Sequence, residues 1–163
     1  MTKKLILILA SIWWGWTAII DFAIVPTVFK VINDFFNAGE LGIALFSKLN
    51  LLEVILASLL VVVAALQLKQ EARGKIQLFL ACSAWLIVIF YFSYLTPKLI
   101  ELTDLWKEAE LVNKIGIAGI NDIQQEHQSY HRMYVGLDSL KLLILTFILG
   151  MSLFKKEASL AKA

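Results

Sequence analysis

Long runs of apolar residues, interrupted by polar residues at helical intervals, dominate the chain. Four such runs cover about residues 5–28, 43–68, 76–97 and 122–154. Each reaches the roughly 20 residues that an α-helix needs to cross the hydrocarbon core of a bilayer. The pattern therefore predicts an all-α fold, an integral membrane up-down four-helix bundle that forms a single transmembrane domain over residues 1–163.

A fifth segment, residues 98–112, separates the third run from the fourth and has a different pattern. Its apolar residues Leu99, Leu102 and Trp106 recur at helical spacing, with acidic and lysine residues between them. Amphipathic helices of this kind commonly lie in the plane of the membrane interface. We therefore expect helix three to end at Pro97, and an amphipathic helix to lie flat on the outer (periplasmic) surface or to cap the bundle.

Composition favours the same class of protein. Hydrophobic residues make up 60% of the 163 and charged residues 17%, and the mean hydropathy is +0.77. The apolar share exceeds that of soluble globular domains. The first run lacks a small-residue cleavage site, so we interpret it as a retained membrane helix rather than a signal peptide. Its tryptophans, Trp13, Trp14 and Trp16, are expected to face lipid or to pack between helices.

The basic residues predict the orientation. Lysine and arginine residues at the two chain ends and in the connection 67–75 share one side of the four-helix arrangement, whereas the connection before the last run is acidic. The positive-inside rule then places both termini in the cytoplasm, and the protein in the inner (cytoplasmic) membrane. The net charge of +2 gives no reason to expect nucleic acid as a partner. The expected partners are the bilayer and either a second copy or another membrane subunit.

The last run carries ionisable and aromatic side chains on one helix face, at spacings of three and four residues. These residues are His127, His131, Tyr134, Asp138 and Lys141. The other runs contain Asp21, Asn50, Glu53, Tyr91 and Tyr94. Because a charge that faces lipid costs at least about 2.5–3.5 kcal/mol, we expect these side chains to turn toward each other. They would form one intramembrane site in the outer half of the bundle.

We interpret this cluster as a metal site. With its three carboxylates ionised and Lys141 charged, the cluster has a net charge of −2, which a divalent cation or two protons would neutralise. Imidazole and carboxylate ligands suit zinc, iron, manganese or copper(II). The predicted ligands are Asp21, Glu53, His127 and His131. The residues expected to support them or to exchange protons are Asn50, Tyr91, Tyr94, Tyr134, Asp138 and Lys141.

Simpler interpretations of several of these residues remain open. Asp138 and Lys141 also fit an internal ion pair that only holds the helices together. Tyr91 and Tyr94 fit aromatic residues at the membrane interface, and His127 fits a solvated position near the lipid headgroups.

Short motifs give a family resemblance. Residues 22–29 read Phe-Ala-Ile-Val-Pro-Thr-Val-Phe, Ala38-Gly39 follows, and then the segment 46–50. With these motifs and a histidine that opens the last helix, His127 or His131, the chain resembles the small four-helix bacterial membrane proteins related to transmembrane protein 205. The resemblance implies a four-helix membrane fold and a link to metal-drug resistance, without a defined reaction.

Three function classes fit these observations. The first is binding or handling of a divalent transition metal. The second is a proton- or ion-coupled carrier subunit in which Glu53, Asp138 and Lys141 exchange protons; because the chain shows no internal repeat of the transporter kind, a carrier would need an oligomer. The third is a structural or assembly subunit of a larger membrane complex. An enzyme is disfavoured, because no P-loop, GxGxxG turn, nucleophile elbow or HExxH helix is present.

Overall fold

The computed structural model describes residues 2–68, 74–113 and 120–153, and almost all of these are helical. The elements in chain order are α1 (Thr2–Ile19), η1 (Ile20–Ile24), α2 (Val25–Val31), α3 (Phe35–Gln67), α4 (Gly74–Phe90), η2 (Tyr91–Leu95), α5 (Thr96–Asn113) and α6 (Ile120–Leu153). Both η elements are π-helical turns. Consecutive elements join into four rods, each long and apolar enough to cross a membrane. The prediction of an all-α fold is confirmed for the described residues, and the four rods have the length and composition of the predicted membrane spans.

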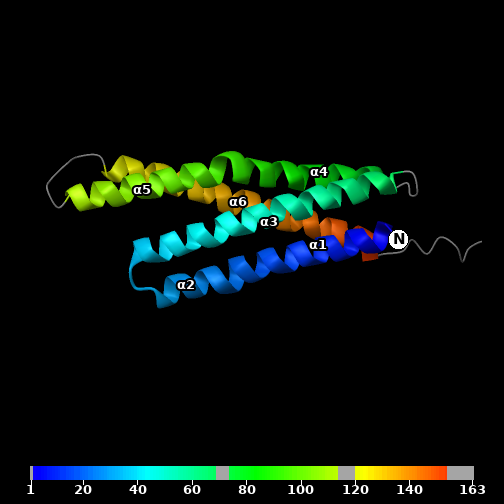
Figure 1. Ribbon diagram of the computed structural model, residues 1–163, viewed down its shortest axis with the longest axis horizontal. Helices are drawn as coiled ribbons and strands as arrows, with labels where there is room; N and C mark the ends of the chain where they lie inside the picture. Colours follow the sequence, from blue (N-terminus) through cyan, green and yellow to red (C-terminus); the bar gives the residue numbers. More distant parts are fainter. Residues whose placement is uncertain (1, 69–73, 114–119, 154–163) are drawn as a thin grey trace, which may run out of the picture.

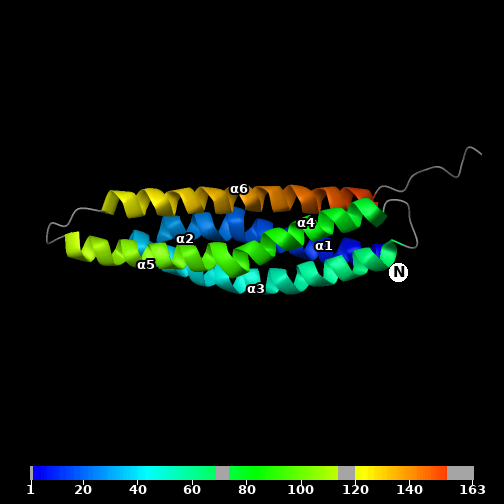
Figure 2. The same ribbon diagram turned by 90° about the horizontal axis from the view of Figure 1, so that it is seen from above.

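The four rods lie side by side and alternate in direction (Figures 1 and 2). Rod α1–α2 packs on α3 and α6, and α4 packs on α3 and α6. The start of α1, the end of α6 and the ends of α3 and α4 that face each other lie at one end of the molecule, which we name the terminus end (Figure 1). The opposite end, with α2 and the far ends of α5 and α6, is named the cavity end.

Each of the two prolines of the chain lies two residues after the end of a π-helical turn. The Val25 N–H donates to the Ile20 carbonyl and the Thr96 N–H to the Tyr91 carbonyl, five residues back in each case. In a regular α-helix the ring of Pro26 or Pro97 would collide with the carbonyl four residues earlier. A widened turn before the proline relieves this clash, so the helix continues. The expectation that the third helix ends at Pro97 is therefore wrong.

Residues 98–112 also differ from the expectation of a separate helix that lies flat or caps the bundle. They belong to α5, which continues the third rod and packs along α6 (Figure 2). Its apolar face is covered by protein, because Leu102 is buried and the ring of Trp106 meets that of Phe36 on α3 edge-on, with centroids 5.5 Å apart. An ion pair between Lys107 and Glu40 joins the same two helices.

The second rod begins earlier than residue 43, the predicted start. Asp34 caps α3, since its side chain accepts from the N–H of Phe36 at 2.8 Å and of Asn37 at 3.1 Å. The rods are therefore 30 to 38 residues long. At about 1.5 Å per residue they exceed the hydrocarbon thickness of about 30 Å by roughly 15–27 Å. The longest uninterrupted apolar stretches of the rods lie toward the terminus end.

The half of the molecule at the terminus end is closely packed. Its core consists of Ile6, Ala10, Trp13, Ala57, Leu60, Ala64, Ala81, Ala84, Val88, Ile144, Leu145 and Ile148. Five of these residues are alanines, whose small side chains let neighbouring helices approach closely in a membrane. The buried charged side chains, Glu53, Asp138 and Lys141, lie farther along the rods, toward the cavity end.

The turn between α3 and α4 provides a test of this packing. A Cβ atom at Gly74 would lie 3.0 Å from both the Gln67 carbonyl oxygen and the Leu68 Cα. We expect Gly74→Ala to destabilise the fold by about 1–3 kcal/mol through overpacking, which lowers the apparent melting temperature in detergent by roughly 2–4 °C per kcal/mol. Gly150→Ala is the matched control, because nothing lies within 4 Å of its Cβ position. A Gly74→Ala variant that melts at or above the temperature of Gly150→Ala would contradict this account.

Candidate functional site

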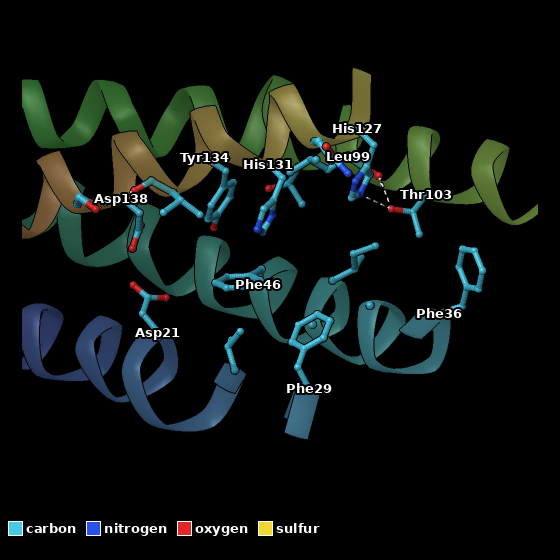
Figure 3. A pocket seen from close by; sticks show the side chains of 18 of the residues that line it. Asp21, Phe29, Phe36, Phe46, Leu99, Thr103, His127, His131, Tyr134 and Asp138 are labelled. Carbon is cyan, nitrogen blue, oxygen red and sulfur yellow. Dashed lines mark hydrogen bonds between the residues drawn. The ribbon is translucent and has the colours of Figure 1, made fainter. Parts of the chain in front are cut away.

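A cavity of about 560 Å³ lies between α2, α3, α5 and α6 at the cavity end (Figure 3). Much of its wall is aromatic: Phe22, Phe29, Phe36, Phe46, Trp106 and Tyr134. Its polar lining consists of Asp21, Thr96, Thr103, His127, Gln128, His131, Asp138 and Ser139. The volume and the mainly apolar wall with a few converging polar groups are typical of small-molecule sites.

Two carboxyl groups meet at the inner end of the cavity. Asp21 on η1 and Asp138 on α6 both line the cavity, and their carboxyl groups point toward one another (Figure 3). We name these two residues the carboxyl pair. Two ionised carboxylates that face each other repel, so a cation or a proton between them stabilises the pair.

A buried ion cluster adjoins the carboxyl pair on its side toward the terminus end. We define it as Glu53, Asp138 and Lys141, so Asp138 belongs to both groups. The Lys141 ammonium contacts the Glu53 carboxylate at 2.6 Å and also pairs with Asp138. The Lys141 and Glu53 side chains are both 0% exposed. Glu53 Oε1 also accepts from Trp13 Nε1 and from Thr17 Oγ1, each at 2.9 Å. These contacts join α1, α3 and α6 at one depth.

Formal charges leave this region short of positive charge. Asp21, Glu53 and Asp138 face a single ammonium group, that of Lys141. With all three carboxyl groups ionised, the excess is two negative charges. In addition, Glu53 Oε2 is buried without a hydrogen-bond partner among the described residues. The inner end of the cavity therefore favours a positively charged ligand.

The structure divides the four predicted metal ligands. Asp21, His127 and His131 line the cavity, whereas Glu53 belongs to the ion cluster and does not line it. The rings of His127 and His131 are parallel, with centroids 6.4 Å apart, and His127 Nε2 lies 3.2 Å from Thr103 Oγ1. Across residues 2–68, 74–113 and 120–153, no three His, Cys, Asp or Glu side chains are grouped to hold one metal ion.

A hydrogen-bond network positions the aromatic wall beside the carboxyl pair. Asn50 donates to Thr96 Oγ1 at 2.6 Å and accepts from the Tyr134 hydroxyl at 3.1 Å. The Tyr91 hydroxyl donates to the Tyr134 backbone carbonyl at 3.0 Å, and the two rings stack at 4.3 Å. The Lys141 ammonium lies 5.4 Å from the centroid of the Tyr91 ring. Asn50 and Tyr91 therefore hold Tyr134 in place from outside the cavity, whereas Tyr134 itself lines the cavity.

Tyr94 lies apart from the other predicted residues. It is 46% exposed, and its hydroxyl pairs with that of Tyr130 at 3.1 Å. Both rings border a second, shallower depression that contains none of the carboxyl groups. The structure does not bring Tyr94 into the cavity.

The family of this chain was sought by comparing its sequence with known protein families. Residues 8–108, more than half of the sequence, match the family described as "Domain of unknown function (DUF4149)". The chain belongs to the DUF4149 family. The matched part includes Asp21, Asn50, Glu53 and Tyr91, whereas α6 lies beyond it. No curated protein and no solved structure matches the chain. The resemblance of this DUF4149 member to relatives of transmembrane protein 205 stays a prediction.

The ion cluster makes a prediction about stability. Lys141→Met leaves Glu53 and Asp138 buried without their cation, and breaking a buried pair in this way costs about 3–5 kcal/mol. We expect a clear fall in the melting temperature of the purified protein. The double variant Lys141→Met/Glu53→Gln should recover part of the loss, because it removes the uncompensated carboxylate.

Lys98→Met is the control for this prediction. Lys98 pairs with Glu101 at 3.2 Å, but the Glu101 side chain is 58% exposed. Exposed pairs of this kind contribute about 0–1 kcal/mol, so its melting temperature should stay close to that of the wild type. Equal effects of Lys98→Met and Lys141→Met would show that the cluster is not a central support of the fold.

Proposed function

We propose that this chain is a membrane carrier subunit whose cavity holds a cation against the carboxyl pair of Asp21 and Asp138. The single observation that carries the proposal is the meeting of these two carboxyl groups at the end of a 560 Å³ cavity. Ionisable groups at membrane depth commonly mark ion pathways and proton relays. In the proposed free state the two carboxyl groups share one proton, because two facing carboxylates repel each other. A bound cation takes the place of this proton, so uptake of the ligand is coupled to proton release.

The proposed orientation turns the cavity end to the outside. The sequence segments that adjoin the rod ends at the terminus end, residues 1–4, 67–75 and 154–163, carry eight Lys and Arg residues and two acidic residues. Residues 25–48 and 96–133, which form or adjoin in sequence the rod ends at the cavity end, carry six basic and eight acidic residues. Basic residues accumulate on the cytoplasmic side of inner-membrane proteins. This bias supports cytoplasmic termini and a cavity in the periplasmic half of the bundle.

The carrier role requires a second subunit. Four rods without an internal repeat give no second half to rock against the first, as carriers with inverted repeats do. Many large apolar side chains point outward, among them Phe79, Phe147 and Leu86. They provide surface for lipid and for either a second copy or a partner membrane protein. We therefore propose an oligomer as the working unit.

A metal ion is a second candidate for the ligand. The observation that favours it is the parallel pair of imidazoles, His127 and His131, on the α6 wall of the cavity. Zinc, iron, manganese or copper(II) accepts imidazole ligands, and water or a partner subunit would have to complete the coordination. The resemblance to relatives of transmembrane protein 205, with their link to metal-drug resistance, supports the same candidate.

The proposal predicts coupled cation binding and proton release. Purified protein is titrated in weakly buffered detergent solution with zinc, manganese and simple organic amines, while calorimetry records the heat and an indicator dye records the pH. We expect at least one of these cations to release about one proton per cation bound, since the pair shares one proton in the proposed free state. Asp21→Asn should abolish the release, and Asp104→Asn, on the exposed face of α5, should not. Binding that is the same in all three proteins would contradict the proposal.

Elemental analysis separates the two ligand classes. If a transition metal is the ligand, protein purified without chelator contains it in stoichiometric amount, and His131→Ala or His127→Ala lowers the content by more than about tenfold. If the ligand is another cation, the histidine variants leave the proton release intact. Loss of binding in Asp21→Asn together with unchanged binding in both histidine variants would rule out the imidazole-ligated metal.

A further inference from the structure

We propose that the ligand is an amphipathic organic cation, an amine with an apolar body, which reaches the cavity sideways from the bilayer between η1 and α6. This inference rests on the proposed cation site at the carboxyl pair and specifies both its ligand and its route. Three features of the structure support it: a lateral gap between two rods, the depth of this gap, and the chemistry of the cavity wall.

The lateral gap opens where the first rod separates from the fourth. Within α1, the seam with α6 is closed, and Trp14 Nε1 donates to Thr146 Oγ1 at 3.0 Å. Beyond Ile19, neither η1 nor α2 packs against α6 in the described part of the chain, and α2 rests on α3 instead. Across this opening the Asp21 side chain points toward Asp138 on α6 (Figure 3).

The rim of the gap lies on the outer surface of the molecule as well as on the cavity. Phe22 on η1 is 73% exposed, Val135 on α6 is 50% exposed, and Ser139 one turn farther is exposed. All three also line the cavity. A side chain that lines a cavity and is also exposed marks a place where the cavity opens to the surroundings of the protein.

The surroundings at this depth are hydrocarbon. Ser139 lies 14 residues from Leu153, the last described residue of α6, and 14 residues of helix rise about 21 Å. This is less than the hydrocarbon thickness of about 30 Å. The gap therefore faces lipid chains rather than water, and a ligand that uses it must partition into the bilayer. A hydrated inorganic ion does not meet this requirement.

The wall of the cavity matches an amine with an apolar body. Phe29, Phe46 and Tyr134 present aromatic rings to the part of the cavity beside the carboxyl pair (Figure 3). Aromatic faces attract organic cations more strongly when these are desolvated, and the same rings pack against an apolar body. The carboxyl pair supplies the negative charge for the ammonium group. One molecule can therefore satisfy both the charged end and the apolar wall.

A set of three matched ligands tests the class. Protein in lipid nanodiscs is titrated with 4-phenylbutylamine, with its neutral analogue 4-phenylbutanol, and with methylammonium, which lacks the apolar body. We expect the amine to bind at least about tenfold more tightly than either of the others, and Asp21→Asn to remove this preference over the alcohol. Binding is followed by tryptophan fluorescence, because Trp106 lines the cavity.

The outcomes of this titration separate the inference from the proposed function. If methylammonium or zinc binds as tightly as phenylbutylamine, the organic class is wrong but the cation site stands. If phenylbutanol equals the amine in the wild type, the cavity takes neutral ligands, and both the inference and the proposed function fail.

Bulk at the rim tests the lateral route. Ser139 and Ser83 are matched positions, since each is a helical serine whose hydroxyl donates to the carbonyl four residues earlier, at 2.9 and 3.0 Å. Only Ser139 lines the cavity. We expect Ser139→Trp to slow both association and dissociation of phenylbutylamine at least about fivefold, and Ser83→Trp to change them less than about twofold. Ser139→Leu provides a milder variant if the tryptophan prevents folding. Rates in a folded Ser139 variant that equal those of the Ser83 control would overturn the lateral route.

Discussion

A fully buried lysine determines much of this structure. The Lys141 ammonium is fully buried between the rods, where an unpaired charge is costly, and carboxylates from two rods compensate it. Glu53 in turn accepts from two side chains of α1. Three rods are thereby held in one register. The alanine-rich half of the molecule packs between this level and the terminus end. On the side toward the cavity, the carboxyl groups of Asp21 and Asp138 leave excess negative charge.

The two prolines determine where the polar groups lie relative to that level. Each follows a π-helical turn, and these turns carry Asp21 and Tyr91. The turn at Ile20–Ile24 presents Asp21 to Asp138 across the seam, and beyond it α2 follows α3 rather than α6. The cavity is therefore the space left where the first rod departs from the fourth. π-helical turns occur frequently at functional sites, and here both lie beside the same group of polar residues.

The sequence predicts the four rods and the polar face of the last one, because hydrophobic length and helical spacing depend on local order alone. It also suggests the Asp138–Lys141 pair, at spacing three. The contacts of Glu53 were not predictable, since its partners Trp13 and Lys141 come from distant segments of the chain. The available signal was the four-residue spacing of Trp13, Thr17 and Asp21, which places them on one face of the first helix. The course of α5 was not predictable either, because an amphipathic pattern does not distinguish a lipid interface from a neighbouring helix. Pro97 predicts a helix end, but in the structure a π-helical turn lets the helix continue past it. The amino-acid sequence gives no sign of such a turn.

The central claim is that a cation replaces a proton between Asp21 and Asp138. Infrared difference spectroscopy observes this event directly, since a protonated carboxyl group has its own C=O stretching band. Adding phenylbutylamine to the wild-type protein should remove one such band, and the change should be absent in both Asp21→Asn and Asp138→Asn. A band that does not change on ligand binding, or a change that persists in both variants, would contradict the account.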